Sequence, residues 1–362
     1  MKRRVFVTQA VGLAAALSSL SFVGGTARAS VSQDSGHRIV DLDWLDADRR
    51  RLVPVRLYLP RRASPARPVP LVVFSHGLGG SRMGYSYLGS HWADEGIASL
   101  HPQHVGSDSG VWRGNPLDLV QRMQSAARES EALARVLDVR FAMDQLLASE
   151  SSALIDASRM AVAGHSYGAN TAMLVSGARV SASGTGLADL QDPRVRAAIL
   201  ISAPPLLGQG PVEQVLGAVS IPTLHVTSVD DTINIPGYRS TVEDRIAIFE
   251  AMRASPKTLA VFNTGGHSIF TDRTTRSGVE TSARIKSATR ELSMLFLRQA
   301  LRLPASPGPS GQGFPLAQQQ NAPELQADRT ADTALREWQQ RQRGLLDRFV
   351  TLDSAATNTY GR

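Results

Sequence analysis

The chain has 362 residues, of which 42% are hydrophobic, 20% charged and 6% aromatic, and it contains no cysteine. This composition fits a globular protein with a large core and excludes a disordered chain. The absence of cysteine excludes disulfides, a cysteine nucleophile and thiolate metal sites. The formal net charge is +7, and four of the basic residues lie within 1–29, which leaves +3 for the remainder. No basic cluster remains there, so nucleic-acid binding is not expected.

The first 29 residues have the pattern of an export signal. Basic residues at 2–4 precede an apolar run at about 10–23, and the A-x-A sequence at 27–29 is typical of a cleavage site. Arg3 and Arg4 also resemble a twin-arginine signal. The apolar run is shorter than the about 20 residues of a membrane anchor, and no later segment reaches that length without charges. We therefore expect a periplasmic or secreted protein with no transmembrane segment in the mature chain.

Apolar runs and amphipathic segments alternate along the next 240 or so residues. The alternating pattern at 52–59 predicts an antiparallel hairpin. Continuous apolar runs, typical of strands buried on both faces, follow at 69–74, 97–100, 160–163, 197–201, 223–226 and 259–262. Between them, helical periodicity predicts helices within 133–147, 170–175, 246–253 and 285–303. This alternation favours an α/β fold with a mostly parallel central sheet and helices on both faces.

The helix predicted within 133–147 has a side that is mainly apolar. Leu133, Val136, Phe141 and Leu147 lie on it, with Arg140 among the charged exceptions. We expect this side to contact the core.

The composition changes after residue 303. Residues 304–323 are rich in Pro, Gly, Ser and Gln, which is typical of a linker. Beyond them, Leu335, Trp338, Leu345 and Phe349 can line one face of a short helix, which either folds back onto the domain or binds a partner. The predicted organisation is a signal peptide at 1–29, an α/β domain at 30–303, a low-complexity linker at 304–333 and a tail with an amphipathic helix at 334–362.

The strongest local pattern is Gly-His-Ser-Tyr-Gly at 164–168. It follows a predicted strand and opens a predicted helix, which is the setting of a nucleophile elbow. Glycines at both ends of the pentapeptide allow the close backbone approach of so sharp a turn. A serine hydroxyl at the tip is a poor nucleophile until a base takes its proton. Ser166 is therefore predicted as a nucleophile that requires a histidine and a carboxylate.

The later part of the chain supplies both groups in the order this architecture requires, with the acid first and the histidine last. His267 is the one histidine downstream of the candidate acids, and it follows the strand predicted at 259–262. Asp231 and Asp230 follow the strand predicted at 223–226, and Asp231 is the first choice. Taken singly, a histidine beside glycines and an acidic turn are ordinary surface features. Together with Ser166 they predict a triad at the carboxyl ends of parallel strands.

A triad of this kind also requires donors for the oxyanion. The backbone N–H of Tyr167, directly after the nucleophile, is one candidate. The N–H of Leu78, in the glycine-rich loop at 76–80, is the other. A phosphate-binding loop is the weaker interpretation, because the chain has neither the G-K-[ST] nor the G-x-G-x-x-G pattern there.

Other polar and aromatic residues give weaker signals. Tyr85 and Trp112 either line the substrate pocket or are ordinary core and loop aromatics. His101 and His104 lack the carboxylate spacing of a metal site, so no metal is predicted. His165 is expected to pack beside the elbow, and His225 to be a core histidine within a strand.

The motifs at 74–80, 85–89 and 164–168 together resemble the α/β-hydrolase superfamily over about residues 70–303. Within it the chain looks most like the bacterial group related to plasma-type platelet-activating-factor acetylhydrolase and dienelactone-hydrolase-like esterases. The resemblance implies a carboxylic-ester hydrolase with the triad Ser166–Asp231–His267 and the oxyanion site at Leu78 and Tyr167. Residues 231–233 are also similar to the acid motif of bacterial cutinases. Dienelactone hydrolases themselves use a cysteine nucleophile, which this chain lacks.

The sequence thus predicts a serine esterase that needs no metal or organic cofactor and acts on small or polymeric esters of short to medium acyl chains. A cutinase-like polyester hydrolase and an amidase or peptidase would use the same three residues. A non-catalytic binding module that uses the cleft to hold a partner is the alternative from a different class.

Overall fold

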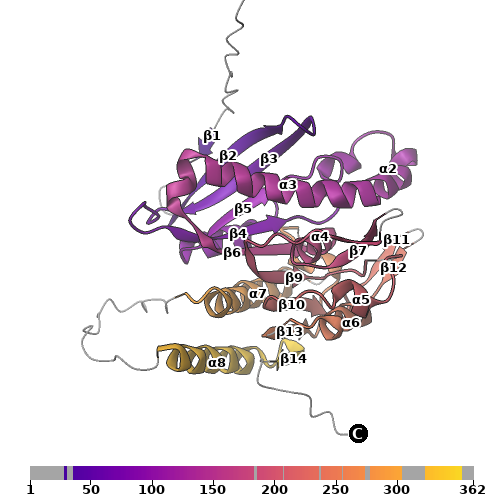
Figure 1. The fold of residues 1–362 in the computed structure, drawn as a ribbon. Helices are drawn as coiled ribbons and strands as arrows, with labels where there is room; N and C mark the ends of the chain where they lie inside the picture. Colours follow the sequence, from indigo (N-terminus) through magenta and orange to yellow (C-terminus); the bar gives the residue numbers. More distant parts are fainter. Residues whose placement is uncertain are drawn as a thin grey trace, which may run out of the picture.

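One large sheet forms the centre of the computed structural model, which describes residues 28–30, 36–182, 186–206, 208–235, 238–254, 256–273, 278–303 and 323–352. Its ten strands lie in the order β1-β2-β3-β5-β4-β6-β9-β10-β13-β14 (Figure 1). In chain order the strands are β1 (Arg28–Ser30), β2 (His37–Asp46), β3 (Arg51–Pro60), β4 (Val69–Ser75), β5 (Ala98–Pro102), β6 (Ile155–His165), β9 (Val195–Ile201), β10 (Thr223–Ser228), β13 (Lys257–Phe262) and β14 (Leu346–Leu352).

Six adjacent strands, from β5 to β13 in the sheet order, are mutually parallel. The remaining four pair antiparallel at the two borders, and β2 with β3 forms the predicted hairpin. The parallel strands are buried along almost their whole length, as their continuous apolar runs predict. The predicted α/β class with a mostly parallel sheet is confirmed.

Helices cover both faces of the sheet. Side chains from α3 (Glu129–Ala148), α4 (Tyr167–Val175), α5 (Val212–Leu216) and α6 (Val242–Ala251) belong to the apolar cluster on one face. Those from α1 (Ser86–Asp94), α7 (Val279–Ala300) and α8 (Pro323–Gln342) belong to the cluster on the other. Smaller elements surround the carboxyl ends of the strands, namely α2 (Leu119–Ala126), the hairpin of β7 (Arg179–Ala182) with β8 (Gly186–Asp189), and that of β11 (Ile233–Ile235) with β12 (Tyr238–Ser240).

The contact face predicted for α3 is partly wrong. Val136 is buried as expected, but Leu133 is 43% exposed, and the side chains of Arg135 and Asp138 are completely buried. Apolar periodicity could not predict this rotation of the helix, because the two buried charges are stabilised by hydrogen bonds from distant segments described below.

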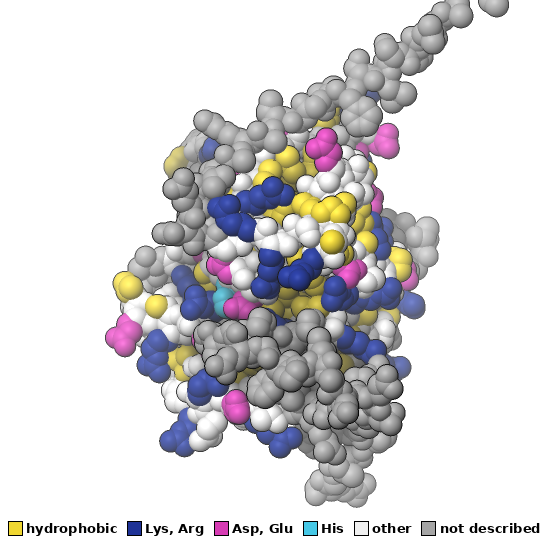
Figure 2. Space-filling view, turned by 90° about the vertical axis from the view of Figure 1, so that its left-hand side faces the viewer, with side chains coloured by type: hydrophobic (Ala, Val, Ile, Leu, Met, Phe, Trp, Pro, Cys, Tyr) yellow, Lys and Arg dark blue, Asp and Glu magenta, His cyan; other side chains and the backbone are white. Residues whose placement is uncertain are grey.

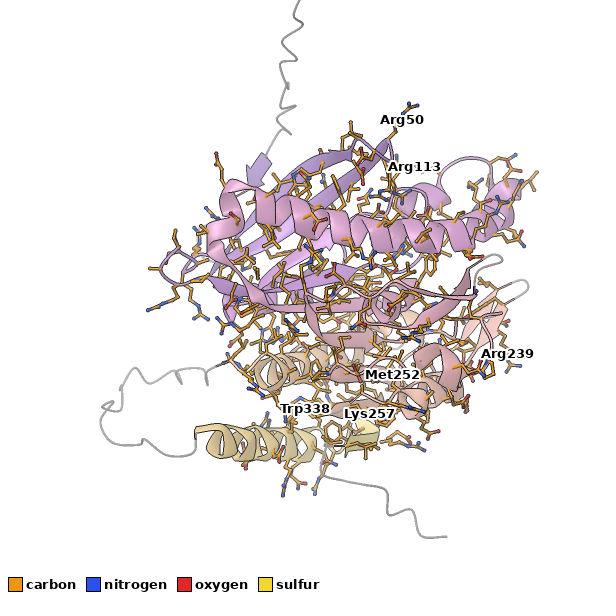
Figure 3. The ribbon with its side chains drawn as sticks, in the orientation of Figure 1. Arg50, Arg113, Arg239, Met252, Lys257 and Trp338 are labelled. Carbon is orange, nitrogen blue, oxygen red and sulfur yellow. The ribbon has the colours of Figure 1, made fainter. Side chains whose placement is uncertain are left out.

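The C-terminal segment belongs to the folded domain. Helix α8 begins at Pro323, inside the range predicted as linker, and β14 extends the sheet by pairing antiparallel with β13, a strand that the sequence analysis did not predict. Trp338 is completely buried against the α7 side of the core, 5.4 Å from the Phe349 ring between centroids (Figure 3). Of the two alternatives, the helix folds back onto the domain. Residues 304–322 and 353–362 lie outside the described residues.

Replacement of Trp338 with alanine is expected to lower the free energy of unfolding by about 3–5 kcal/mol, because it leaves a large cavity under α8. Denaturant unfolding followed by circular dichroism measures this change. Arg336→Ala, two residues away on the exposed side of the same helix, is the control and should change the free energy by less than about 0.5 kcal/mol. Equal stability of the two variants would show that α8 is not part of the core.

The predicted signal peptide, 1–29, lies outside the described residues except for Arg28 and Ala29. These two belong to β1, which pairs with β2 through Ser30↔Ile39 and the two preceding pairs. Cleavage after Ala29 would remove two of the three residues of this strand. In the part of the chain that the structure describes, no helix combines the length and the apolar character needed to cross a bilayer.

Basic side chains are spread over the surface. On the face shown in Figure 2, Lys and Arg side chains alternate with acidic, apolar and neutral ones. Several of them are paired, for example Arg56 with Asp41 at 2.7 Å and Arg82 with Asp43 at 2.6 Å.

Candidate active site

The turn between β6 and α4 holds Ser166 in a strained conformation. Its backbone has φ 55° and ψ −125°, a left-handed φ that costs a non-glycine residue about 1–3 kcal/mol. A Cβ atom on Gly164 would lie 2.1 Å from the carbonyl oxygen of Gly168, and one on Gly168 would lie 1.9 Å from that of Ser75. Both glycines are therefore required for the turn, which has the geometry of a nucleophile elbow.

The structure brings Ser166, His267 and Asp231 together. The Ser166 hydroxyl donates to Nε2 of His267 at 2.7 Å, and Nδ1–H of His267 donates to Oδ1 of Asp231, also at 2.7 Å. Each residue follows the carboxyl end of a parallel strand, namely β6, β13 and β10. Because these strands are neighbours or near neighbours in the sheet, residues 101 and 36 positions apart in the sequence meet at one point.

Asp231 is completely buried and held as a carboxylate. Burial by itself would raise its pKa, but the hydrogen bond from His267 and the charges of His267 and Arg245 outweigh this effect and lower the pKa of Asp231 below its usual range. Thr227 donates to its other oxygen at 2.7 Å. Arg245, buried on α6, lies 3.4 Å from the same carboxylate. An ionised Asp231 can fix the imidazole tautomer and stabilise its protonated form.

Asp230, the other acid considered, has a different position. It is exposed and accepts hydrogen bonds from the backbone N–H of Gly265 at 3.1 Å and from the Thr264 hydroxyl at 3.3 Å. The Ser228 hydroxyl donates to the carbonyl oxygen of Gly265. These contacts join the loop after β10 to the loop that carries His267, so Asp230 holds the loop rather than the imidazole.

The predicted oxyanion donors belong to residues that line one cavity. Leu78, Ser166 and Tyr167 all line it. The N–H of Tyr167 is in the first turn of α4, where backbone donors have no intrahelical acceptor, and no acceptor for the N–H of Leu78 is found among the described residues. The neighbouring amide of Gly79 is tied to the carbonyl of Ser107 at 2.8 Å, which fixes the loop.

Beneath this loop lies a buried arginine that the sequence analysis missed. Arg135 of α3 donates to the hydroxyls of Ser107 at 2.8 Å and Thr171 at 2.9 Å, to that of Ser75, and to the carbonyl oxygen of His76. Its guanidinium also lies 4.5 Å from the centre of the Tyr167 ring. Burial lowers the pKa of Arg135 to about 10, so it remains charged at neutral pH. Arg135 thus connects the loop at 76–80 to the helix that follows Ser166.

Asp138, one helical turn further along α3, is also buried and charged. Asp138 accepts from Arg49 and Arg51 at 2.8–2.9 Å and from Nδ1–H of His104 at 3.1 Å. Nε2 of His104 in turn accepts from the Ser75 hydroxyl at 2.9 Å. Each charge has partners, as burial requires.

Arg135→Met is expected to lower kcat for ester hydrolysis by about 10- to 100-fold, because the loop that carries the Leu78 amide loses its support and small displacements of oxyanion donors are costly. The measurement is kcat per active site, with sites counted by covalent labelling of Ser166. Arg140→Met removes another arginine of α3, which donates to the carbonyl of Gln191, and should leave kcat within about twofold. A loss equally large in the Arg140 variant would refute a specific role for Arg135.

Tyr85 and Trp112, predicted either to line the substrate pocket or to be core and loop aromatics, do not line the cavity. The Tyr85 hydroxyl is buried and donates to Nδ1 of His165 at 2.8 Å. The indole N–H of Trp112 donates to the carbonyl oxygen of Gly79 at 2.7 Å. Both side chains contact the back of the loop at 76–80 rather than the space in front of it, so the prediction is corrected.

Two further histidines lie where the sequence predicts them. His165 packs beside the elbow, and its Nε2–H donates at 3.0 Å to the backbone carbonyl of His267, which helps to position the base. Burial lowers the pKa of His165 to about 3, so its ring is neutral. His225 is a core residue that contacts Thr223 at 3.1 Å and Phe249 edge-on.

His101 and His104, the two histidines considered as metal ligands, have other partners. His101 contacts the Ser99 hydroxyl at 2.8 Å, and His104 belongs to the network around Asp138. No group of three or more His, Asp or Glu side chains with metal-binding geometry occurs within the described residues.

The cavity that opens beside Ser166 has a volume of about 860 Å³. Its walls are mainly apolar and come from α2, α3, α4, the β7–β8 and β11–β12 hairpins and the segment after β9. Val120 and Leu133, which are 44% and 43% exposed, mark where it meets solvent. Leu133 was predicted to contact the core, but its side chain is exposed because it forms part of this wall.

The parallel sheet, the elbow and the order of the loops define the α/β-hydrolase fold. Residues 56–112 match the family described as platelet-activating factor acetylhydrolase, isoform II. This range includes the loop at 76–80 and Tyr85. The likeness to this group that the sequence motifs indicate is confirmed for this part of the chain.

Two solved structures are similar to about three quarters of the chain. A cold-adapted esterase from an Arctic intertidal metagenomic library is 17% identical, with a TM-score of 0.51 over 76% of this chain and 99% of its own. A ferulic acid esterase from Streptomyces cinnamoneus is 23% identical, with a TM-score of 0.52 over 74% of this chain and 90% of its own. No curated protein matches the chain. At these identities the likeness shows the α/β-hydrolase fold.

Proposed function

We propose that the protein is a serine esterase that hydrolyses carboxylic esters through an acyl-enzyme. The observation that carries this proposal is the continuous chain of two 2.7 Å hydrogen bonds from Ser166 through His267 to Asp231. Ser166 also lines an apolar cavity. The match to an acetylhydrolase family and the fold shared with two esterases support it. A non-catalytic binding module would give no reason for the backbone strain at Ser166.

The first half of the reaction acylates the serine. His267 takes the hydroxyl proton as Ser166 Oγ attacks the ester carbonyl carbon. The backbone amides of Leu78 and Tyr167 donate to the oxyanion that forms, each contributing about 3 kcal/mol of transition-state stabilisation. The protonated imidazole, paired with ionised Asp231, then gives its proton to the alcohol oxygen as the carbon–oxygen bond breaks.

The second half releases the acid. Water attacks the acyl carbon while His267 takes one of its protons, and the same two amides hold the second oxyanion. The bond to Ser166 Oγ breaks, His267 returns the proton to that oxygen, and the carboxylic acid leaves. No step requires a metal or a redox cofactor.

The proposal is tested by a fluorophosphonate probe and by a matched pair of substrates. We expect covalent labelling at Ser166, located by peptide mass mapping, and faster release of p-nitrophenol from butyrate esters than of p-nitroaniline from the butyranilide. Folded protein that neither labels nor hydrolyses the ester would overturn the proposal. Faster cleavage of the anilide would assign the same residues to an amidase instead.

A further inference from the structure

The acid of the triad faces a buried arginine. Arg245 of α6 is 2% exposed. Its Nη2 lies 3.4 Å from Oδ1 of Asp231, and its Nε lies 3.4 Å from Oδ2. One edge of the guanidinium therefore meets both carboxylate oxygens, which places a positive charge directly beside the acid.

This contact supplies charge rather than orientation. A separation of 3.4 Å is long for an N–H···O hydrogen bond, and Nε of Arg245 has no hydrogen-bond partner among the described residues. The short bonds to Asp231 come from His267 and Thr227, both at 2.7 Å. Arg245 is itself held through Nη1, which donates to the carbonyl oxygen of Thr241 at 2.8 Å. Loss of the guanidinium would leave the bonds that orient Asp231 in place.

The same charge lies close to the base of the triad. Oδ1 of Asp231 is 2.7 Å from Nδ1 of His267 and 3.4 Å from Nη2 of Arg245, so these two nitrogen atoms are no more than about 6 Å apart. Asp231 stabilises the protonated imidazole, and Arg245 opposes it. At an effective dielectric constant of about 20, two charges at this separation shift a titration midpoint by about one to two pH units. Salt reduces the effect little, because Arg245 and Asp231 are both buried.

The other ionisable groups near the base are neutral, partly exposed or directed elsewhere. The His165 ring is centred 4.9 Å from that of His267, and burial lowers the pKa of His165 to about 3, so it is uncharged. Burial raises the pKa of the Tyr238 phenol, which stays protonated at neutral pH. Arg135 is a second buried cation, but it lies beneath the loop at 76–80 and donates to it. The charged side chains of the adjoining loops and of α6 are partly or fully open to solvent, which weakens their fields: Asp230, Glu243, Asp244, Asp272 and Arg273.

We propose that Arg245 sets the lower pH limit of the enzyme: its charge keeps Nε2 of His267 able to accept from Ser166 under more acidic conditions than Asp231 alone would allow. This inference rests on the esterase function proposed above. The imidazole must be unprotonated before Ser166 can attack, and repulsion from Arg245 favours that state. Asp231 remains ionised beside the guanidinium, so the imidazole keeps the partner that fixes its tautomer.

The pH profile of kcat/KM for p-nitrophenyl butyrate, followed as released butyrate, tests this role. We expect Arg245→Met to move the midpoint of the acid limb upward by about one to two pH units, because the variant loses the charge but keeps an unbranched side chain. The rate on the alkaline plateau should stay within about threefold, since the bonds that orient Asp231 remain. Arg245→Lys keeps the charge and should keep the midpoint within about half a pH unit of the wild type.

Arg239→Met is the matched control. Arg239 is exposed on β12 and lies at the outer edge of the molecule (Figure 3). Loss of this exposed charge should move the midpoint by less than about 0.3 pH unit, because water and salt screen it. An equal shift in the Arg239 and Arg245 variants would show that net charge rather than the buried contact causes it, and would overturn the proposal.

A folded Arg245→Met variant whose plateau falls while its midpoint stays unchanged would also overturn the proposal, because damage to the site gives that result. So would a folded variant with no activity at any pH. Thermal unfolding across the pH range shows which variants are folded. If Arg245→Met is not, Arg245→Gln takes its place with the same expectation. If neither folds, the wild-type profile decides, since a midpoint above about pH 7 would mean that the charge of Asp231 prevails and that the proposal is wrong.

The outcomes separate the two proposals. If Ser166 does not label and the wild type hydrolyses no ester, the esterase function fails. If the wild type labels and hydrolyses esters, but Arg245→Met leaves the midpoint unchanged, the esterase function stands and the role of Arg245 is wrong.

Discussion

Ser166→Ala is expected to lower kcat/KM for carboxylic esters by about 10⁴- to 10⁶-fold. The variant keeps the oxyanion amides and the cavity but has no atom that can form the acyl-enzyme, so only the residual catalysis from binding and the oxyanion site remains. Initial rates with p-nitrophenyl butyrate measure the loss. Labelling by the fluorophosphonate should disappear in parallel, because the probe reacts with the same oxygen.

Ser176→Ala, at the other end of α4, is the control for this result. The Ser176 side chain is buried, and its hydroxyl has no hydrogen-bond partner among the described residues. Its removal should leave both activity and labelling within about twofold. A Ser166→Ala variant that keeps more than about 1% of the wild-type rate would show that another residue is the nucleophile.

Asp231→Asn should lower kcat by about 10⁴-fold. An asparagine in this position can present an N–H to the imidazole, which favours the tautomer with its proton on Nε2, so His267 can no longer accept from Ser166. The substitution also leaves Arg245 buried without its counter-charge, so a lower melting temperature is expected as well. Steady-state kinetics at neutral pH, corrected for the folded fraction, measures the effect.

Asp230→Asn, at the neighbouring residue, is the control for Asp231→Asn. Its side-chain oxygen can still accept from the Gly265 amide and the Thr264 hydroxyl, which are the contacts that Asp230 makes. We expect kcat to remain within about threefold of the wild type. If this variant is the inactive one and Asp231→Asn is active, the acid of the triad has been assigned to the wrong residue.

Local sequence patterns account for most of the fold and for the three hydrogen-bonded residues Ser166, His267 and Asp231. The parallel strands are continuous apolar runs, and the elbow requires glycine at 164 and 168 for steric reasons, so each could be predicted from a few adjacent residues. His267 and Asp231 could be predicted because each follows such a strand, and the carboxyl ends of parallel strands lie together.

Features that depend on distant segments could not be predicted in this way. Arg135 is buried because four hydrogen-bond acceptors converge on it, from the end of β4, the loop after β4, the loop after β5, and α4. No local pattern reveals that convergence. The cavity likewise combines side chains from separate helices and hairpins. The sequence left open whether Tyr85 and Trp112 line the pocket, because their positions in the chain indicate proximity to the loop at 76–80 but not the direction of the side chains.

The place of β14 bears on the motions of the protein. The outermost strand of a sheet opens most readily, because its amides have only one neighbouring strand. Here β14 takes that position and β13 becomes an inner strand. Fraying at this border therefore begins in the C-terminal segment, and β14 must open before the strand that leads to His267 becomes an edge strand.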